Sequence, residues 1–186
     1  MGFGIDMNKI KILIVTVFLT AFGGATYADY QDGVDAYIKG DYKTAFKEWQ
    51  PLADQGDADA QYNLGLMYGN GRGVLKDDKQ AVKWYRKAAD QSVAEAQYNL
   101  GWMYANGKGV LKDDKEAVKW YLKAADQGFA EAQYSLGWMY ASGKGVLKDM
   151  TKAKYWIKKA YENPDVSAST LELAEKAWNQ HKLWKY

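Results

Sequence analysis

The residues best suited to binding chemistry occupy one face of a helical segment that occurs three times. In its first copy, Asn63, Leu66 and Asn70 stand at i, i+3 and i+7, which places them on the same helical face. The corresponding positions hold Asn99, Trp102 and Asn106 in the second copy, and Ser135, Trp138 and Ser142 in the third. Amides and hydroxyls can hydrogen-bond a peptide backbone, and an indole buries a large area while keeping one polar group. We predict that these nine residues line a partner-binding groove, with the two tryptophans as anchors. The alternative is that both tryptophans pack between neighbouring repeats.

Catalytic residues are scarce in comparison. His181 is the only histidine, so no second imidazole is present for a metal site or a proton relay. The chain has no cysteine, which excludes a zinc–thiolate site, a disulfide and a thiol nucleophile. The Ser-x-x-Lys, Lys-Thr-Gly and Gly-x-Ser-x-Gly signatures of serine acyl transfer are also absent. We therefore predict no enzyme activity, no cofactor and no metal. A cell-wall or β-lactam-directed hydrolase is the enzymatic alternative.

Two recurring motifs have structural explanations. The Gly-x-Gly loops at 71–73, 107–109 and 143–145 follow a predicted helix and lack a third glycine, which favours interhelical turns with positive φ over phosphate binding. Asp77 and Asp113 stand where a second helix should begin, with Gln80 and Glu116 three residues further on. We expect both aspartates to cap the helices that follow them.

A unit of 36 residues carries all these motifs. The segment 60–68 (Ala-Gln-Tyr-Asn-Leu-Gly-Leu-Met-Tyr) returns at 96–104 and at 132–140 with few changes. Each copy leads through a glycine loop into a second helical pattern that contains Ala-Val-Lys-Trp-Tyr in two of the three units. Periods of this length are typical of stacked two-helix units. The sequence predicts an all-α fold, an α-solenoid of about four helix-turn-helix hairpins and a C-terminal capping helix.

Glycine at the centre of three predicted first helices indicates close helix packing. Glycine costs about 1 kcal/mol relative to alanine inside a helix, and here that cost recurs at Gly65, Gly101 and Gly137. We expect the second helix of each unit to approach closely at these positions through Ala81, Ala117 and Ala153.

Two helix ends give further expectations. Ser92 occupies the position that Gly128 holds in the next unit, and a non-glycine residue there implies a turn without positive φ. Ser169 and Glu172 have the spacing of a capping box and should open the final helix.

The N-terminus has the pattern of a secretory signal peptide. Lys9 and Lys11 precede an apolar run at 12–22, and small residues follow before Asp29. We predict cleavage after Ala28, with Ala25 as the alternative site, and a periplasmic or secreted mature protein without stable membrane insertion. An uncleaved anchor is the other possibility, although the apolar run is shorter than a spanning helix requires.

The repeated motifs resemble those of the Sel1-like repeat family, a relative of the tetratricopeptide repeat. The resemblance is close over 60–162 and looser over 29–59, whose connecting turn at 39–42 is of the tetratricopeptide type. It divides the chain into a signal peptide (1–28), a tetratricopeptide-like hairpin (29–59), three Sel1-like repeats (60–95, 96–131 and 132–167) and a capping helix (168–186).

The resemblance implies a right-handed α-solenoid that acts as an adaptor, and we expect it to bind a protein or peptide partner in its concave groove. Exported bacterial members are implicated in envelope assembly, signalling or host contact, so a scaffold that uses its convex face or its ends is the alternative. One secreted, cysteine-rich branch of the family has carried a β-lactamase label, but this chain lacks every cysteine of that branch. A net charge of +2 with both signs interspersed gives no reason to expect a nucleic-acid partner.

Overall fold

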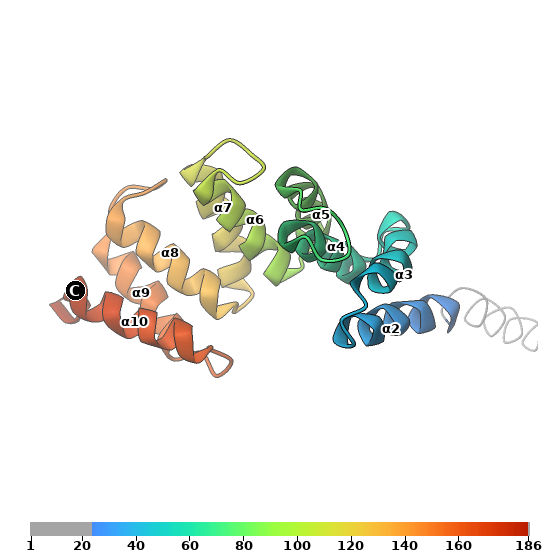
Figure 1. Cartoon of the computed structure of the whole chain (residues 1–186). Helices are drawn as coiled ribbons and strands as arrows, with labels where there is room; N and C mark the ends of the chain where they lie inside the picture. Colours follow the sequence, from blue (N-terminus) through green and yellow to red (C-terminus); the bar gives the residue numbers. More distant parts are fainter. Residues whose placement is uncertain (1–23, 186) are drawn as a thin grey trace, which may run out of the picture.

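The computed structural model describes residues 24–185, and every regular element within that range is helical (Figure 1). The α-helices are α2 (Gly24–Ile38), α3 (Tyr42–Asp54), α4 (Ala58–Asn70), α5 (Asp78–Asp90), α6 (Ala94–Asn106), α7 (Asp114–Asp126), α8 (Ala130–Ser142), α9 (Met150–Tyr161) and α10 (Ala168–Gln180). A short 3-10 helix, η1 (Leu183–Lys185), follows α10. The all-α fold class is confirmed.

The helices pack as successive hairpins that form a solenoid. Helix α2 pairs with α3, α4 with α5, α6 with α7 and α8 with α9, and each second helix also packs against the first helix of the next hairpin. Figure 1 shows the pairs following one another from α2–α3 to α8–α9, with α10 at the end of the array. The predicted four hairpins and terminal helix are therefore present.

The hydrophobic core lies at the boundaries between hairpins. At one boundary, Ala88 and Ala89 of α5, Leu100 and Met103 of α6, and Trp120 of α7 form a single buried cluster. Two further tryptophans of second helices, Trp84 and Trp156, take the same place in the clusters on either side. Each boundary is thus closed by a large indole that comes from the following hairpin.

Capping aspartates begin the second helices, as predicted. Asp77 Oδ1 accepts from the backbone N–H groups of Lys79 at 2.9 Å and Gln80 at 3.0 Å. Asp113 does the same in the next unit. These bonds satisfy N–H groups that have no partner within the helix.

The final helix begins earlier than the sequence predicts. Ser167, not Ser169, is the N-cap of α10, and its hydroxyl accepts from Thr170 N at 3.3 Å. The Ser169–Glu172 capping box is therefore wrong, because Ser169 already lies within the first helical turn.

The glycine positions partly follow prediction. A Cβ on Gly101 would lie 2.8 Å from Cδ1 of Tyr121, so close helix approach is confirmed. The tyrosine ring makes the closest contact, and the backbone oxygen of Ala117 follows at 3.2 Å, so the predicted approach to Ala117 is found at its backbone. The tyrosine ring needs the room that glycine leaves.

The turn at Ser92 also differs from expectation. Ser92 has φ 69°, whereas the sequence predicted a turn that avoids positive φ. Gly128, at the same place in the next unit, has φ 89°. The repeat geometry therefore demands a left-handed residue here, and serine adopts it at a conformational cost.

Most of the predicted signal peptide, residues 1–23, lies outside the described residues. Helix α2 begins at Gly24 and passes through Ala28, the expected cleavage position, so export remains a prediction. None of the helices within residues 24–185 has the length and apolar character needed to span a bilayer.

Candidate protein-binding groove

Two pockets of the same construction open between successive first helices. Pocket A, between α4 and α6, and pocket B, between α6 and α8, each have a volume of about 370 Å³. Residues of the intervening second helix and loops complete each wall. The pairs of equivalent lining residues are Gly69 and Ala105, Asn70 and Asn106, Lys76 and Lys112, Asp78 and Asp114, Tyr85 and Tyr121, Asn99 and Ser135, Trp102 and Trp138, Met103 and Met139, and Lys108 and Lys144.

Seven of the nine residues predicted to form a groove line these pockets. Leu66, Asn70, Asn99 and Trp102 belong to pocket A, and Asn106, Ser135 and Trp138 belong to pocket B. The other two, Asn63 and Ser142, line neither pocket: Asn63 Nδ2 donates to Tyr30 Oη at 3.1 Å, and Ser142 Oγ donates to Met139 O at 3.3 Å.

The two predicted anchors differ in their surroundings. Trp102 is 44% exposed and belongs to none of the buried clusters. Trp138 is half-buried against the cluster that contains Tyr121 and Met139, and the ammonium of Lys144 lies 4.6 Å from the centre of its ring. Packing between repeats therefore describes Trp138 in part and does not describe Trp102.

The predicted asparagine donors are partly used within their own helices. Asn70 Nδ2 donates to Leu66 O at 2.9 Å, and Asn106 Nδ2 donates to Trp102 O at 2.8 Å. In both residues the amide oxygen is left to accept a hydrogen bond from a ligand.

Cations outnumber carboxylates in both pockets. Pocket A contains Lys76 and Lys108 with one carboxylate, Asp78. In pocket B, Lys112 lies 3.9 Å from Asp114, and Lys144 stacks on the indole. These ammonium groups favour a segment that brings at least one negative charge beside its apolar side chains.

A buried phenol forms the floor of each pocket. Burial raises the pKa of Tyr85 and that of Tyr121, so both phenols are neutral hydrogen-bond donors at physiological pH. Neither the two tyrosines nor the loop lysines were singled out from the sequence, although their 36-residue spacing repeats that of the predicted residues. The sequence does not indicate their role, because it does not show which side of the second helix and of the loop faces the neighbouring repeat.

Features of a metal-dependent enzyme do not emerge in the part of the chain that the structure describes. No group of three or more His, Cys, Asp or Glu side chains there is arranged to hold a metal ion. His181 is the C-cap residue of α10, remote from both pockets in sequence and absent from their linings. The absence of enzyme activity remains a prediction.

Comparison with known proteins identifies the repeats. The Sel1 repeat model matches residues 58–93, 94–129 and 130–165, each match starting two residues before the unit predicted from the sequence. The search of curated proteins returned no match.

Solved structures share the fold. A Sel1 repeat protein from Oxalobacter formigenes is 34% identical, with a TM-score of 0.73 over 83% of this chain and 60% of that one. A protective antigen of uropathogenic Escherichia coli strains, which displays an SLR fold, is 38% identical with a TM-score of 0.73 over 87% of this chain and 34% of that one. Helicobacter pylori cysteine-rich protein B is 25% identical, with a TM-score of 0.52 over 69% of this chain and 96% of that one.

The chain thus spans 60% and 34% of the length of the first two structures. The Sel1 repeat fold is in general a scaffold for protein–protein interaction. Three consecutive matches to the family model, together with the two structures above 30% identity, settle the classification: the chain belongs to the Sel1 repeat family.

Proposed function

We propose that this protein is an exported adaptor that binds a protein or peptide partner along pockets A and B. The exposure of Trp102 at pocket A is the observation that carries the proposal. A large indole left in water loses the stabilisation that burial would give it, and exposed aromatics of this kind are typical anchors of protein interfaces.

The repetition of the pockets supports a partner segment that touches two repeats. Each pocket offers an indole for apolar contact, a neutral phenol as a donor and two ammonium groups for acidic side chains. A segment with two apolar side chains, each near a carboxylate, would meet the same set of groups twice. Two such contacts within one chain reinforce each other, because the second forms at high effective concentration.

A capture experiment with matched variants tests the groove. The full chain is compared with a Trp102→Ala, Trp138→Ala variant in captures from an envelope extract. The control is a Leu122→Ala, Tyr155→Ala variant, which removes two exposed apolar side chains from the second helices α7 and α9. Circular dichroism first establishes that all three proteins are folded.

The proposal expects one discrete protein to be captured by the full chain and by the control, and to be lost from the tryptophan variant. Loss from the control alone would move the binding surface to the second helices and support the scaffold alternative. Retention by both variants would contradict the groove.

Export is tested separately. Expression of the full chain, followed by cell fractionation and mass spectrometry of the N-terminus, should give a mature protein that starts at Asp29. A cytoplasmic protein with an intact N-terminus would contradict export and leave the groove experiment unaffected.

A further inference from the structure

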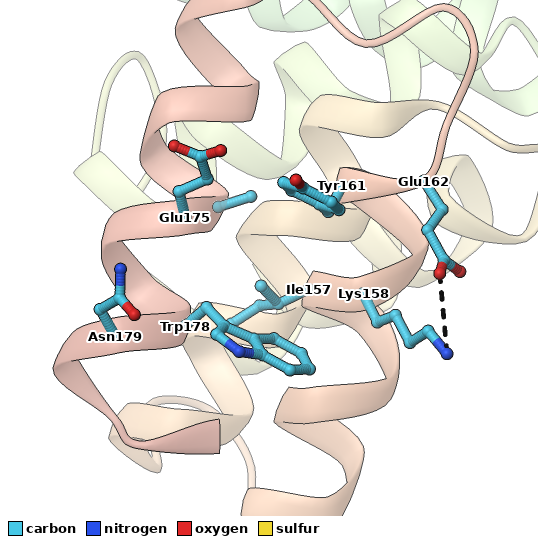
Figure 2. Close-up of a pocket in the computed structure, with 8 residues that line it drawn as sticks. Ile157, Lys158, Tyr161, Glu162, Glu175, Trp178 and Asn179 are labelled. Carbon is cyan, nitrogen blue, oxygen red and sulfur yellow. Dashed lines mark ion pairs between the residues drawn. The ribbon is translucent and has the colours of Figure 1, made fainter. Parts of the chain in front are cut away.

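A third pocket, separate from the groove, lies at the C-terminal end of the solenoid. Pocket C has a volume of about 550 Å³ and opens between α9 and α10. In Figure 2, Tyr161 of α9 and Glu175 of α10 lie on one side of it and the indole of Trp178 on the other, with Ile157 between the two helices.

Helix α10 takes the place that a first helix holds in the interior of the array. Its buried residues Thr170, Ala174 and Ala177 follow the buried residues of α8 at a constant offset of 38 residues. The residues of α8 to which they correspond are Ala132, Leu136 and Met139. Helices α9 and α10 therefore form the same kind of boundary as α7 and α8.

In the interior, the second helix of the next hairpin covers this boundary. Trp156 of α9 completes the cluster formed by α7 and α8, and Trp120 of α7 completes the one before it. Within the described residues, the cluster between α9 and α10 contains Ile157, Ala174 and Leu183 of η1, and no further α-helix follows to cover it. Pocket C is thus the position at which the array would accept another second helix.

The lining of pocket C specifies what such a helix must carry. Glu175 stands where interior first helices have glycine: a Cβ on Gly137 would lie 2.5 Å from Cγ1 of Ile157 in the helix packed against it. Within residues 24–185 Glu175 forms no ion pair, whereas Lys158 and Glu162 on the opposite rim pair at 3.6 Å. In the interior, each second helix places a tyrosine or an isoleucine against that glycine. A helix in pocket C would instead meet the carboxylate of Glu175 at this position.

We propose that pocket C binds an amphipathic α-helix of a partner protein, with an indole between Tyr161 and Trp178 and a cationic residue against Glu175. A second copy of this chain is a poor source of that helix. Its own tryptophan-bearing second helices use their indoles as buried core residues, namely Trp49, Trp84, Trp120 and Trp156.

The probe is a synthetic helix copied from α7, residues 114–126, which carries Trp120 followed by Tyr121. A hydrocarbon link between the exposed positions 115 and 119 keeps it helical, because an isolated helix this short is marginal in water. A second version carries Tyr121→Lys. Binding of both fluorescent peptides to the full chain is followed by polarisation.

We expect saturable binding with a dissociation constant below about 100 μM, which is reasonable for a small interface. The Tyr121→Lys peptide should bind roughly threefold more tightly than the parent, the effect of a partly exposed ion pair. Glu175→Gln in the full chain should abolish that difference.

Variants of α9 locate the site. Tyr161→Asp should weaken both peptides at least about tenfold, since it places a charge on the apolar wall. Tyr155→Asp is the matched control on the same helix, because Tyr155 is exposed and lies outside pocket C. Circular dichroism confirms that both variants are folded.

No saturable binding up to about 1 mM, an equal loss with both tyrosine variants, or a Lys preference that survives Glu175→Gln would each overturn the proposal. The Trp102→Ala, Trp138→Ala variant should bind the peptides normally. Failure at pocket C is therefore distinguishable from failure of the groove.

Discussion

The side-chain amides of Gln97 and Gln127 join the two helices of one repeat, with Gln127 Nε2 donating to Gln97 Oε1 at 2.8 Å. Gln97 is almost completely buried, and its own Nε2 donates at 3.1 Å to the backbone oxygen of Ala89, which belongs to the preceding repeat. The same arrangement links Gln91 to Gln61 at 2.8 Å and Asn163 to Gln133 at 3.3 Å. A ladder of amides therefore runs through the repeats, each rung satisfying polar groups that packing has removed from water.

Replacement of Gln97 by leucine should destabilise the fold. The substitution leaves Ala89 O without its side-chain donor and Gln127 without its acceptor, which costs about 1–3 kcal/mol when the groups are buried. Urea unfolding followed by circular dichroism measures the change. Gln127→Leu is the comparison: it leaves Gln97 Oε1 without its donor but keeps the bond from Gln97 to Ala89 O, so we expect a smaller loss, of about 1 kcal/mol. Equal losses in the two variants would contradict the explanation by burial.

The sequence predicted the repeat period, the hairpins and the capping by Asp77, because each depends on local patterns. It gave no role to Gln97, although the glutamine recurs in every copy of the motif. Glutamine on a helix is usually exposed, and only the packing of the preceding second helix buries this one. Burial of that kind cannot be derived from a single helix.

The candidate sites show the same limit. Trp102 and Trp138 occupy identical positions in the repeat, yet only Trp138 packs against a core cluster and beneath a lysine. Pocket C was not predicted, because the buried residues of α10 follow those of α8 with an offset of 38 residues, whereas the repeats have a period of 36. The longer connection, which includes Pro164, conceals the equivalence.

Two glycines of α4 should respond oppositely to alanine. A Cβ on Gly65 would lie 2.5 Å from Cδ1 of Tyr85, so Gly65→Ala should cost about 1–3 kcal/mol through overpacking. A Cβ on Gly69 would have its nearest neighbour at 3.6 Å, an ordinary contact, and Gly69→Ala should stabilise the helix by roughly 0.5–1 kcal/mol. Thermal unfolding of the two variants provides the comparison. Stabilisation by both would show that Tyr85 moves aside without cost.

Ser92→Gly should stabilise the protein. Ser92 has φ 69°, and glycine tolerates this region where other L-residues are strained, so we expect a gain of about 0.5–1 kcal/mol after the greater flexibility of the unfolded chain is included. The reciprocal change, Gly128→Ser at φ 89°, should cause a loss of similar size. Nothing lies within 4 Å of the position of a Cβ on Gly128, so the loss would report backbone strain alone. Chemical denaturation of the pair tests both signs, and changes in the same direction would contradict the argument.

Alkaline pH should unfold the protein partly through Tyr121. Burial, followed by the neighbouring Tyr98 and Asp114, raises the pKa of Tyr121 above its ordinary value near 10. A raised pKa in the folded state means that the neutral phenol is favoured by folding. The associated stability is fully present below about pH 10 and is lost as the pH rises through the folded-state pKa. The ionisation of Tyr121 should therefore leave the free energy of unfolding unchanged between pH 7 and pH 9 and lower it above about pH 10.

Tyr121→Phe separates this contribution from others. The variant should lie within about 1 kcal/mol of the parent at pH 7, because the structure gives the Tyr121 hydroxyl no hydrogen bond among the described residues. Its alkaline unfolding midpoint, measured by circular dichroism, should move to higher pH, because one group that must ionise in the core has been removed. Tyr155→Phe, at an exposed tyrosine of α9, should leave the midpoint unchanged. If Tyr121→Phe also left it unchanged, ionisation at this pocket floor would not contribute to alkaline unfolding, and Tyr85, which burial places in the same position one repeat earlier, would have to be tested in its stead.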